Sequence, residues 1–323
     1  MTRFGVTLAI MLCFARVHAQ IPEMPQSEFE AMVEELSNWG RWGREDQIGA
    51  LNLITPEKRL QAAKLVKEGI SISLAHPAAT EVTPDNPNPY FHTMLRHGGS
   101  EGMWAMDELK VSYHGFAHTH MDSLCHLFYK GKMYNGFSRS EVTRLGARKL
   151  SIDNVQGGIF TRGVLIDIPA LRGVDYLEPG EVILPEELIA WENRTGVRIQ
   201  PGDVVLIRTG RWAAREAKGP WSVNDSGAAG LHATCGRWIK ARDIAMLGSD
   251  AGSDVAPSGV EGVTHPIHVL ALHAMGVHIL DCCDLEELHR VTQKLQRWDF
   301  LLQAAPIPVK GGTGSPLNPI ATF

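Results

Sequence analysis

Four histidines and one aspartate are concentrated in a single short segment of this sequence. Residues 114–126 read HGFAHTHMDSLCH and contain His114, His118, His120, Asp122 and His126. Imidazole nitrogens and carboxylates are ligands for Zn²⁺, Mn²⁺ or Fe²⁺, whereas Ca²⁺ and Mg²⁺ prefer shells made of oxygen alone. No cysteine has an obvious place in this set, which favours an open catalytic metal site over a closed structural zinc site.

The spacing of these residues suggests how they come together. His114, His118, His120 and Asp122 are separated by even numbers of positions, so in an extended strand their side chains would point to one face. Alternate side chains on that face lie about 6.5–7 Å apart, close enough for imidazoles and a carboxylate to converge on one ion. The alternative is a set of hydrogen-bonded or solvated histidines without a metal. The pattern favours a metal site.

A second group of potential ligands lies near the C-terminus, where residues 265–288 read HPIHVLALHAMGVHILDCCDLEEL. We expect a helix over Val269–Met275 and a strand over Val277–Leu280, and this helix-turn can return Asp281 close to His268. By spacing alone, other residues compete for the role: His265, His273, His278 and Asp284.

The elements that must position these groups are predicted from apolar periodicity and from the placement of glycine and proline. We expect helices over Ser27–Trp39, from Pro56 to Gly69 with Thr55 as N-cap, and over Pro185–Asn193 and Ala228–Arg242. We expect strands over Ile70–Leu74, Val111–His120, Gly163–Ile168, Asp203–Arg208 and Ile244–Leu247, and an irregular proline-rich loop over residues 77–90. The mixture without regular alternation predicts one α/β domain over residues 20–323. Asp250, after the last of these strands, is a candidate for orienting a ligand histidine or, alternatively, part of a surface turn.

Composition narrows the class of protein. The chain has 323 residues, of which 44% are hydrophobic, and a formal net charge of −5. This hydrophobic content excludes a disordered chain, and the absence of a basic excess argues against nucleic-acid binding. A small-molecule substrate is the remaining expectation.

The N-terminus has the features of an export signal. Arg3 precedes an apolar run over Phe4–Ala15, and Val17-His-Ala19 fits a cleavage site. We therefore expect residues 1–19 to be a signal peptide and the mature chain to be periplasmic or extracellular. The apolar run is too short to span a bilayer, and no later segment approaches the required length. The four cysteines beyond it are too few for a disulfide framework, so we expect them to be buried and free: Cys125, Cys235, Cys282 and Cys283.

At Phe116–His126 the sequence resembles the metal-dependent cyclase family, which includes kynurenine formamidase and isatin hydrolase. That family's signature is His-x-Gly-Thr-His-x-Asp-x-Pro-x-His. The segment FAHTHMDSLCH matches it at Thr119, His120, Asp122 and His126. It departs from it where Phe116 replaces the first histidine, His118 the glycine and Leu124 the proline. Segments at 42–57, 198–210, 266–288 and 311–321 also resemble a longer branch of the family.

The resemblance implies a swivelling β/β/α-type domain with a mixed sheet around the metal site, usually oligomeric, here a homo-oligomer. It implies one or two divalent ions, Zn²⁺ or Mn²⁺, that serve hydrolysis of an amide, lactam or ester bond. By position, His120 and Asp122 are metal ligands, and His118 is the best substitute for the lost first histidine, with His114 as the alternative. His126 corresponds to a general acid/base or a second-metal ligand, His268 to the downstream histidine, and Asp281 to a metal-binding glutamate of the formamidases.

The expected reaction is hydrolysis by a metal-activated water, with His126 moving the proton. The chain contains no G-x-S-x-G motif of a serine hydrolase. Two alternatives remain. One is a metal-dependent cyclase or lyase acting on a polyketide-like or sugar-like substrate, and the other is an exported metal- or ligand-binding protein without catalysis.

Overall fold

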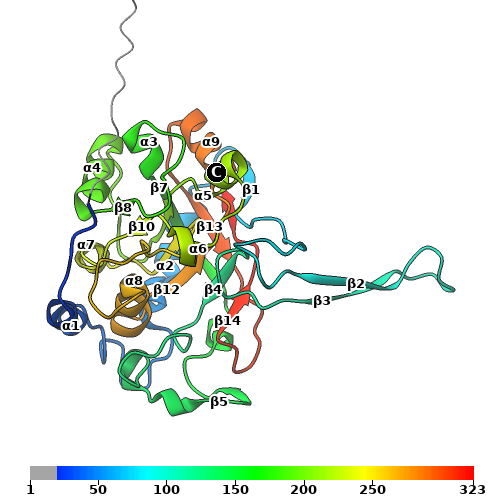
Figure 1. The fold of residues 1–323 in the computed structure, drawn as a ribbon, viewed down its shortest axis with the longest axis horizontal. Helices are drawn as coiled ribbons and strands as arrows, with labels where there is room; N and C mark the ends of the chain where they lie inside the picture. The colour runs from blue at the N-terminus through cyan, green and yellow to red at the C-terminus, as the bar shows by residue number, and fades with distance from the viewer. Residues whose placement is uncertain (1–19) are drawn as a thin grey trace, which may run out of the picture.

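A computed structural model describes residues 20–323 of the chain. The predicted signal peptide, residues 1–19, lies outside these described residues. The structure is an α/β protein built on a curled, nine-stranded mixed sheet with the strand order β1-β15-β13-β7-β9-β11-β12-β4-β14 (Figure 1). The strands of this sheet are β1 (Ser71–Ser73), β4 (His120–Asp122), β7 (Ile159–Asp167), β9 (Val204–Arg208), β11 (Met246–Ser249), β12 (His278–Asp281), β13 (Asp299–Ala304), β14 (Gly314–Pro316) and β15 (Ile320–Thr322).

The centre of the sheet is parallel and buried on both faces. Strands β7, β9, β11 and β12 pair in parallel, while the outer pairs are antiparallel. Alternate residues of these strands belong to two separate apolar clusters, with Val205 and Ile207 in one and Val204 and Leu206 in the other. This explains why the sequence reads there as a continuous apolar run, as is usual for buried parallel strands.

Helices supply the remaining apolar surface on each side. Residues of α1, α4, α7 and the π-helix η5 belong to the first cluster, and residues of α9 to the second. The helices are α1 (Gln26–Glu35), α2 (Pro56–Ala63), α3 (Ile168–Arg172), α4 (Pro185–Thr195), α5 (Arg211–Lys218), α6 (Val223–Ser226), α7 (Cys235–Arg242), α8 (Pro266–His268), η5 (Val269–Met275) and α9 (Glu286–Leu295). Short 3-10 turns occur at η1 (Gly49–Leu53), η2 (Tyr134–Gly136), η3 (Arg139–Glu141) and η4 (Ile152–Val155). No helix within residues 20–323 combines the length and apolar character needed to cross a bilayer.

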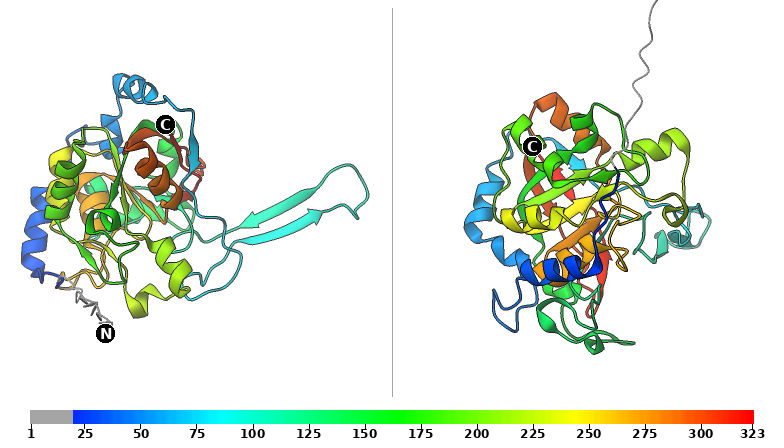
Figure 2. Two further views of the ribbon diagram at one scale, coloured as in Figure 1. Left: turned by 90° about the horizontal axis from the view of Figure 1, so that it is seen from above. Right: turned by 60° about the vertical axis from the view of Figure 1, so that its left-hand side comes forward.

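Three small sheets lie outside the main one. They pair β8 (Val182–Ile183) with β10 (Gly230–Leu231), β5 (Val142–Thr143) with β6 (Gly146–Ala147), and β2 (Phe91–Arg96) with β3 (Met106–Lys110). The β2–β3 hairpin projects from the rest of the protein in Figure 1 and in the left-hand view of Figure 2. The sequence reasoning did not predict this hairpin, nor α5, α9 and β13 to β15.

Several predicted elements are confirmed with shifted ends. The helix opened by Thr55 is α2, and the Thr55 hydroxyl accepts a hydrogen bond from Lys58 N at 3.2 Å, as an N-cap should. This helix ends at Ala63 rather than Gly69, and the first helix ends at Glu35 rather than Trp39. Residues 77–90 form no helix or strand. The four cysteines of the described chain are free and buried, as expected.

The strand predicted over Val111–His120 is wrong. Residues 111–119 form no strand, and β4 begins only at His120. Gly115 adopts a φ of 140°, a conformation that side chains other than glycine rarely tolerate and that turns the chain out of an extended path. The alternating-face argument therefore holds only for His120 and Asp122.

The helix predicted over Ala228–Arg242 is wrong in its first half. Gly230 and Leu231 instead pair in parallel with Val182 and Ile183, and the helix begins at Cys235. A Cβ atom at Gly230 would lie 2.4 Å from the backbone of Asp254. This close approach explains the glycine, and apolar periodicity alone does not reveal it.

Candidate metal centre

The pairing of β4 with β12 brings together residues that are far apart in sequence. In this antiparallel pair His120 lies directly opposite Asp281, and Asp122 follows His120 on the same face of β4. All three side chains are buried. Their potential ligand atoms lie within 4.8 Å of one another, so that the three residues could hold a metal ion.

Asp122 also belongs to a second group, which it forms with His114 and His126. His114 Nδ1 lies 2.9 Å from Asp122 Oδ1, and His126 Nε2 lies 3.9 Å from Asp122 Oδ2. The two imidazole rings are stacked, with centroids 3.9 Å apart. Their side chains are 30% and 31% exposed, so this side of the cluster is open to solvent.

His268 approaches both carboxylates from the C-terminal helix-turn. Its Nε2 lies 3.6 Å from Asp122 Oδ2 and 3.3 Å from Asp281 Oδ2. Gly276, at φ 66°, ends the π-helix and starts the return into β12. The prediction that this turn returns Asp281 close to His268 is confirmed. Like His268, the four competing residues lie outside the two groups of three found among the described residues: His265, His273, His278 and Asp284. Of these five, His268 is the one with ion-pair contacts to Asp122 and Asp281 within the described chain.

Further contacts fix the orientation of the rings. His120 Nδ1 donates to the backbone oxygen of His118 at 2.7 Å, and His268 Nδ1 donates to Asp254 Oδ2 at 2.6 Å. His114 Nε2 lies 3.0 Å from the Thr313 hydroxyl. Each contact occupies one ring nitrogen and turns the other toward Asp122, which is how outer contacts prepare metal-binding histidines. Asp281 is held similarly, because Ser253 Oγ donates to its Oδ1 at 2.8 Å.

The structure places the imidazole of His118 away from Asp122. Its Nε2 donates to the backbone oxygen of Asn88 at 2.9 Å, and its ring contacts Tyr90 edge-on. The backbone carbonyl of His118 orients the ring of His120. The turn at Gly115 brings His114, rather than His118, to the carboxylate of Asp122. Of the residues predicted as ligands, His120, Asp122, His268 and Asp281 come together, and His118 does not join them.

Unpartnered polar atoms show that the cluster fits a cation. Both carboxylate oxygens of Asp122 and Nδ1 of His114 are buried without a hydrogen-bond partner, since the 2.9 Å approach between these residues lacks hydrogen-bond geometry. A buried carboxylate without donors is costly. A divalent ion would satisfy these atoms, and the nitrogen and oxygen donor set suits Zn²⁺, Mn²⁺ or Fe²⁺.

The electrostatics of the cluster also favour a bound cation. Burial alone would raise the pKa of Asp122, but the neighbouring His114, His120 and His268 hold it well below its usual range. Burial lowers the pKa of His126 to about 4, which leaves its ring neutral at pH 7. Burial would also lower the pKa of His268, yet its carboxylate neighbours raise it well above its ordinary value. Asp122 is therefore ionised.

Asp250 does not serve the cluster as predicted, and it does not lie in a surface turn. It is fully buried and accepts hydrogen bonds from the backbone of Thr209, Gly210 and Arg211 and from the Thr209 hydroxyl. It thereby anchors the start of α5. Burial raises its pKa to about 6. The carboxylate that orients a histidine is Asp254, four residues later, which sequence reasoning missed.

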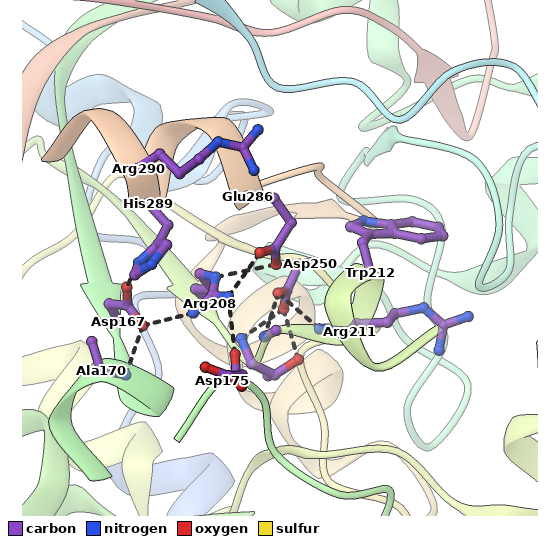
Figure 3. A network of polar contacts seen from close by, with 12 residues as sticks. Asp167, Ala170, Asp175, Arg208, Arg211, Trp212, Asp250, Glu286, His289 and Arg290 are labelled. Atoms are coloured by element: carbon purple, nitrogen blue, oxygen red, sulfur yellow. Dashed lines mark hydrogen bonds and ion pairs between the residues drawn. The ribbon is translucent and has the colours of Figure 1, made fainter. Parts of the chain in front are cut away.

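A second polar network lies at the carboxyl ends of the parallel strands (Figure 3). Arg208, at the end of β9, donates to Asp167, at the end of β7, at 3.1 Å and to Glu286 of α9 at 2.8 Å. His289 of α9 also contacts Asp167. The network holds α9 against the sheet. Its charged residues are buried because they pair with one another, and they do not belong to the cluster of histidines around Asp122.

Two cavities lie near the cluster and both touch Phe116, the residue at the position of the lost signature histidine. One of about 120 Å³ is lined by residues of the proline-rich loop and by Tyr113, His114 and Phe116. The other, of about 1260 Å³, is lined by Phe116, Asp254, His265 and the segment 256–264. The Phe116 ring packs against Gly252, where a Cβ atom would lie 2.5 Å from it.

Comparison with known proteins identifies the family of this chain. Residues 61–254 match the family described as "Putative cyclase". A solved structure described as a novel cyclase is 31% identical, with a TM-score of 0.80, and the match covers 89% of this chain and 100% of that one. The chain belongs to the cyclase family.

Two isatin hydrolases share the fold of this cyclase-family protein. Isatin hydrolase A from Ralstonia solanacearum is 23% identical with a TM-score of 0.58, covering 78% of this chain and 91% of that one. An isatin hydrolase bound to the product analogue thioisatinate is 18% identical with a TM-score of 0.56, covering 83% and 98%. No curated protein matches the chain.

The family match includes the signature segment and Asp254 but ends before His268 and Asp281. Sequence reasoning missed three residues that orient the cluster, namely Ser253, Asp254 and Thr313. Asp254 had a detectable signal, because it ends the short polar run Ser249-Asp-Ala-Gly-Ser-Asp254 directly after a predicted strand. Thr313 lies in a glycine-rich stretch that gives no such indication.

Proposed function

We propose that this cyclase-family protein is a metal-dependent hydrolase that opens an amide, lactam or ester bond of a small cyclic or aromatic substrate. The observation that carries the proposal is Asp122, a buried carboxylate without hydrogen-bond donors that is shared by two groups of potential ligands. Burying a carboxylate without hydrogen-bond donors costs free energy, and a purely structural role for Asp122 would not offset that cost.

In this proposal the metal is held by His120, Asp122, His268 and Asp281, with His114 in place of His118. The two overlapping groups at Asp122 are compatible with one or two ions, zinc or manganese by donor chemistry. When bound, such an ion polarises a carbonyl group and makes water more acidic.

His126 then acts as the general acid/base. Its ring stacks on His114 beside Asp122 and is partly exposed, so a water molecule and a substrate can both reach it. A neutral imidazole there takes a proton from the attacking water and returns it to the leaving nitrogen or oxygen, as general acid–base catalysis requires. Asp122 lies beside this ring and stabilises it while it carries the proton.

The proposed substrate class is supported by the fold shared with isatin hydrolases, because isatin is an aromatic lactam. It is also supported by the Phe116 ring, which gives the cavities beside the cluster an apolar wall. We further propose that the domain is of the swivelling β/β/α type and that the mature enzyme acts outside the cytoplasm.

The test couples metal analysis to a substrate panel. The metal content of the purified protein is measured by mass spectrometry, and hydrolysis of N-formyl aromatic amines, isatins and lactones is followed before and after chelation. We expect His120→Ala to lose both metal and activity, while His97→Ala, an exposed histidine, keeps both. Full activity of the metal-free protein, or a metal-loaded protein that hydrolyses no member of the panel, would contradict the proposal.

A further inference from the structure

The two cavities beside the candidate metal centre meet at Phe116. The smaller one, of about 120 Å³, is here called the narrow cavity, and the larger one, of about 1260 Å³, the wide cavity. Val223 and Asn224, at the start of α6, also line both of them. Phe116 and the start of α6 therefore form the boundary between the two cavities.

The narrow cavity is the one that meets a candidate metal ligand. It is lined by His114, whose Nδ1 lies 2.9 Å from Asp122 Oδ1. The wide cavity instead touches Asp254, which orients His268 and is not itself a candidate ligand. A substrate that occupies both cavities thus has its reacting group in the narrow one.

The volume of the narrow cavity limits what can react there. A cavity of about 150 Å³ holds one benzene molecule, and one water molecule takes up about 30 Å³. At about 120 Å³, the narrow cavity has room for a carbonyl group with a small substituent, but not for a benzene ring with a group attached. An aromatic part of the substrate must therefore lie in the wide cavity, whose volume is about ten times larger.

Hydrogen bonds hold the backbone on the Phe116 side of this boundary. Arg211 Nη2 donates to the carbonyl of Phe116 at 2.9 Å, and Cys282 Sγ donates to the carbonyl of Gly115 at 3.3 Å. Arg211 is itself buried and paired with Asp85 of the proline-rich loop. Because buried contacts fix this backbone, the side chain at position 116 sets the width of the passage between the cavities.

The ring of Phe116 is also restrained. It packs so closely on Gly252 that a Cβ atom there would lie 2.5 Å from the ring, and the Arg211 guanidinium lies 5.9 Å from the ring centroid. Gly252 lines the wide cavity and has no side chain that could fill the space of the ring. A shorter side chain at position 116 would therefore join the two cavities.

We propose that Phe116 is a specificity-determining residue, which admits to the cluster only a carbonyl group whose substituent is no larger than about a methyl group. The aromatic part of the substrate then lies in the wide cavity, against the Phe116 ring. This inference rests on the proposed hydrolase function and narrows its substrate class. The substrates are formyl or acetyl amides and esters, or lactams and lactones with the carbonyl group at the edge of the ring, and benzoyl compounds are excluded.

The experiment measures the binding of two metal-chelating probes, acetohydroxamate and benzohydroxamate, to the zinc-loaded protein by isothermal titration calorimetry. The probes differ in that a phenyl ring replaces a methyl group, so the ratio of their Kd values reports the room beside the metal without any turnover. The unaltered protein is compared with Phe116→Leu and Phe116→Ala. Phe160→Ala is the matched control, because Phe160 is half-buried on β7, with β9, β11 and β12 between it and β4.

We expect the unaltered protein and Phe160→Ala to bind acetohydroxamate more tightly than benzohydroxamate. In Phe116→Ala the Kd of benzohydroxamate, divided by that of acetohydroxamate, should fall by about tenfold or more, with Phe116→Leu in between. An unchanged zinc content shows that the variants keep an intact cluster. An unaltered protein that prefers benzohydroxamate, or a ratio that stays the same in both Phe116 variants, would overturn the proposal. An equal fall in Phe160→Ala would overturn it too.

The substrate panel separates the failure of this inference from the failure of the proposed hydrolase. If the zinc-loaded protein hydrolyses no member of the panel but the ratio falls as expected, the hydrolase is wrong and the size limit at Phe116 stands. If the protein hydrolyses N-formyl amines and the ratio does not change, the hydrolase stands and Phe116 does not determine its specificity. A protein that holds no zinc and binds neither probe would overturn both.

Discussion

The Nδ1 atom of His268 lies 2.6 Å from Oδ2 of Asp254, and this contact directs Nε2 of the same ring toward Asp122 and Asp281. Oδ1 of Asp254 also accepts a hydrogen bond from Ile267 N at 2.6 Å. One buried carboxylate therefore fixes both the start of α8 and the orientation of a candidate ligand. Such carboxylate–histidine pairs raise the basicity of the metal-facing nitrogen.

We predict that Asp254→Asn weakens metal binding by about 10- to 100-fold while the protein stays folded. The amide keeps an acceptor for the backbone of α8, but it removes the negative charge that holds the imidazole. Titration with Zn²⁺ in competition with a chromogenic chelator measures the affinity. Asp225→Asn, an exposed aspartate in α6, is the control and should bind Zn²⁺ as the unaltered protein does. An unchanged affinity in Asp254→Asn would show that His268 needs no such orientation.

The paired variants His114→Ala and His118→Ala distinguish the two candidates for the missing signature histidine. We predict that His114→Ala lowers the amount of tightly bound metal, because it removes the nitrogen 2.9 Å from Asp122 Oδ1. His118→Ala should retain the metal, since the imidazole of His118 binds Asn88 and only its backbone carbonyl orients His120. Metal content by mass spectrometry decides between them, and the opposite ranking would restore His118 as the ligand.

The parts of the site that sequence could predict are those set by local spacing. His120 and Asp122 are two residues apart on one strand, and the turn between His268 and Asp281 is short enough for its helix and strand to be recognised. The parallel strands β7 and β9 were predicted for the same reason, since their apolar runs are local signals.

The parts that could not be predicted depend on contacts between distant segments. His114 reaches Asp122 only because Gly115 breaks the extended path, and its ring is placed by Thr313, 199 residues away. Asp250 and Asp254 both follow β11, but only the packing of α5 and α8 decides which carboxylate meets a backbone and which meets a histidine. No periodicity in the sequence reports these contacts.

The proposed signal peptide can be tested without an activity assay. If residues 1–19 are removed after export, the mature protein begins at Gln20. N-terminal sequencing of the protein recovered from the periplasm or medium of an expressing bacterium checks this. Arg16→Glu and Arg3→Glu alter the charge of the segment, and we expect Arg3→Glu to impair export more, because a basic start is the part that signal peptides require. A protein retained in the cytoplasm with Met1 intact would contradict the assignment.

The buried pair of Asp167 and Arg208 should contribute to folding stability in a way that depends on pH. Asp167 accepts hydrogen bonds from Arg208 and from Ala170 N at the start of α3, and both charged side chains are almost completely buried. Burial alone would raise the pKa of Asp167, but His289 and Arg208 lower it below its ordinary value. We predict that Asp167→Asn reduces the free energy of unfolding at pH 7 by about 3 kcal/mol, because it leaves Arg208 without that charge.

The lowered pKa of Asp167 determines how the stability difference between the two proteins changes with pH. Since the pKa of Asp167 is lower in the folded state, its ionised form stabilises the fold at pH values above about 4, the unfolded-state pKa. This contribution is lost as the pH falls through the lower, folded-state pKa. In urea unfolding, the difference between the unaltered protein and Asp167→Asn should therefore be constant above about pH 5 and shrink in more acidic solution. Glu35→Gln, which breaks an exposed pair with Arg237, should cost less than about 1 kcal/mol throughout. Equal losses in the two variants, or a difference that grows in acid, would show that the buried charge of Asp167 does not stabilise this junction of β7, β9 and α9.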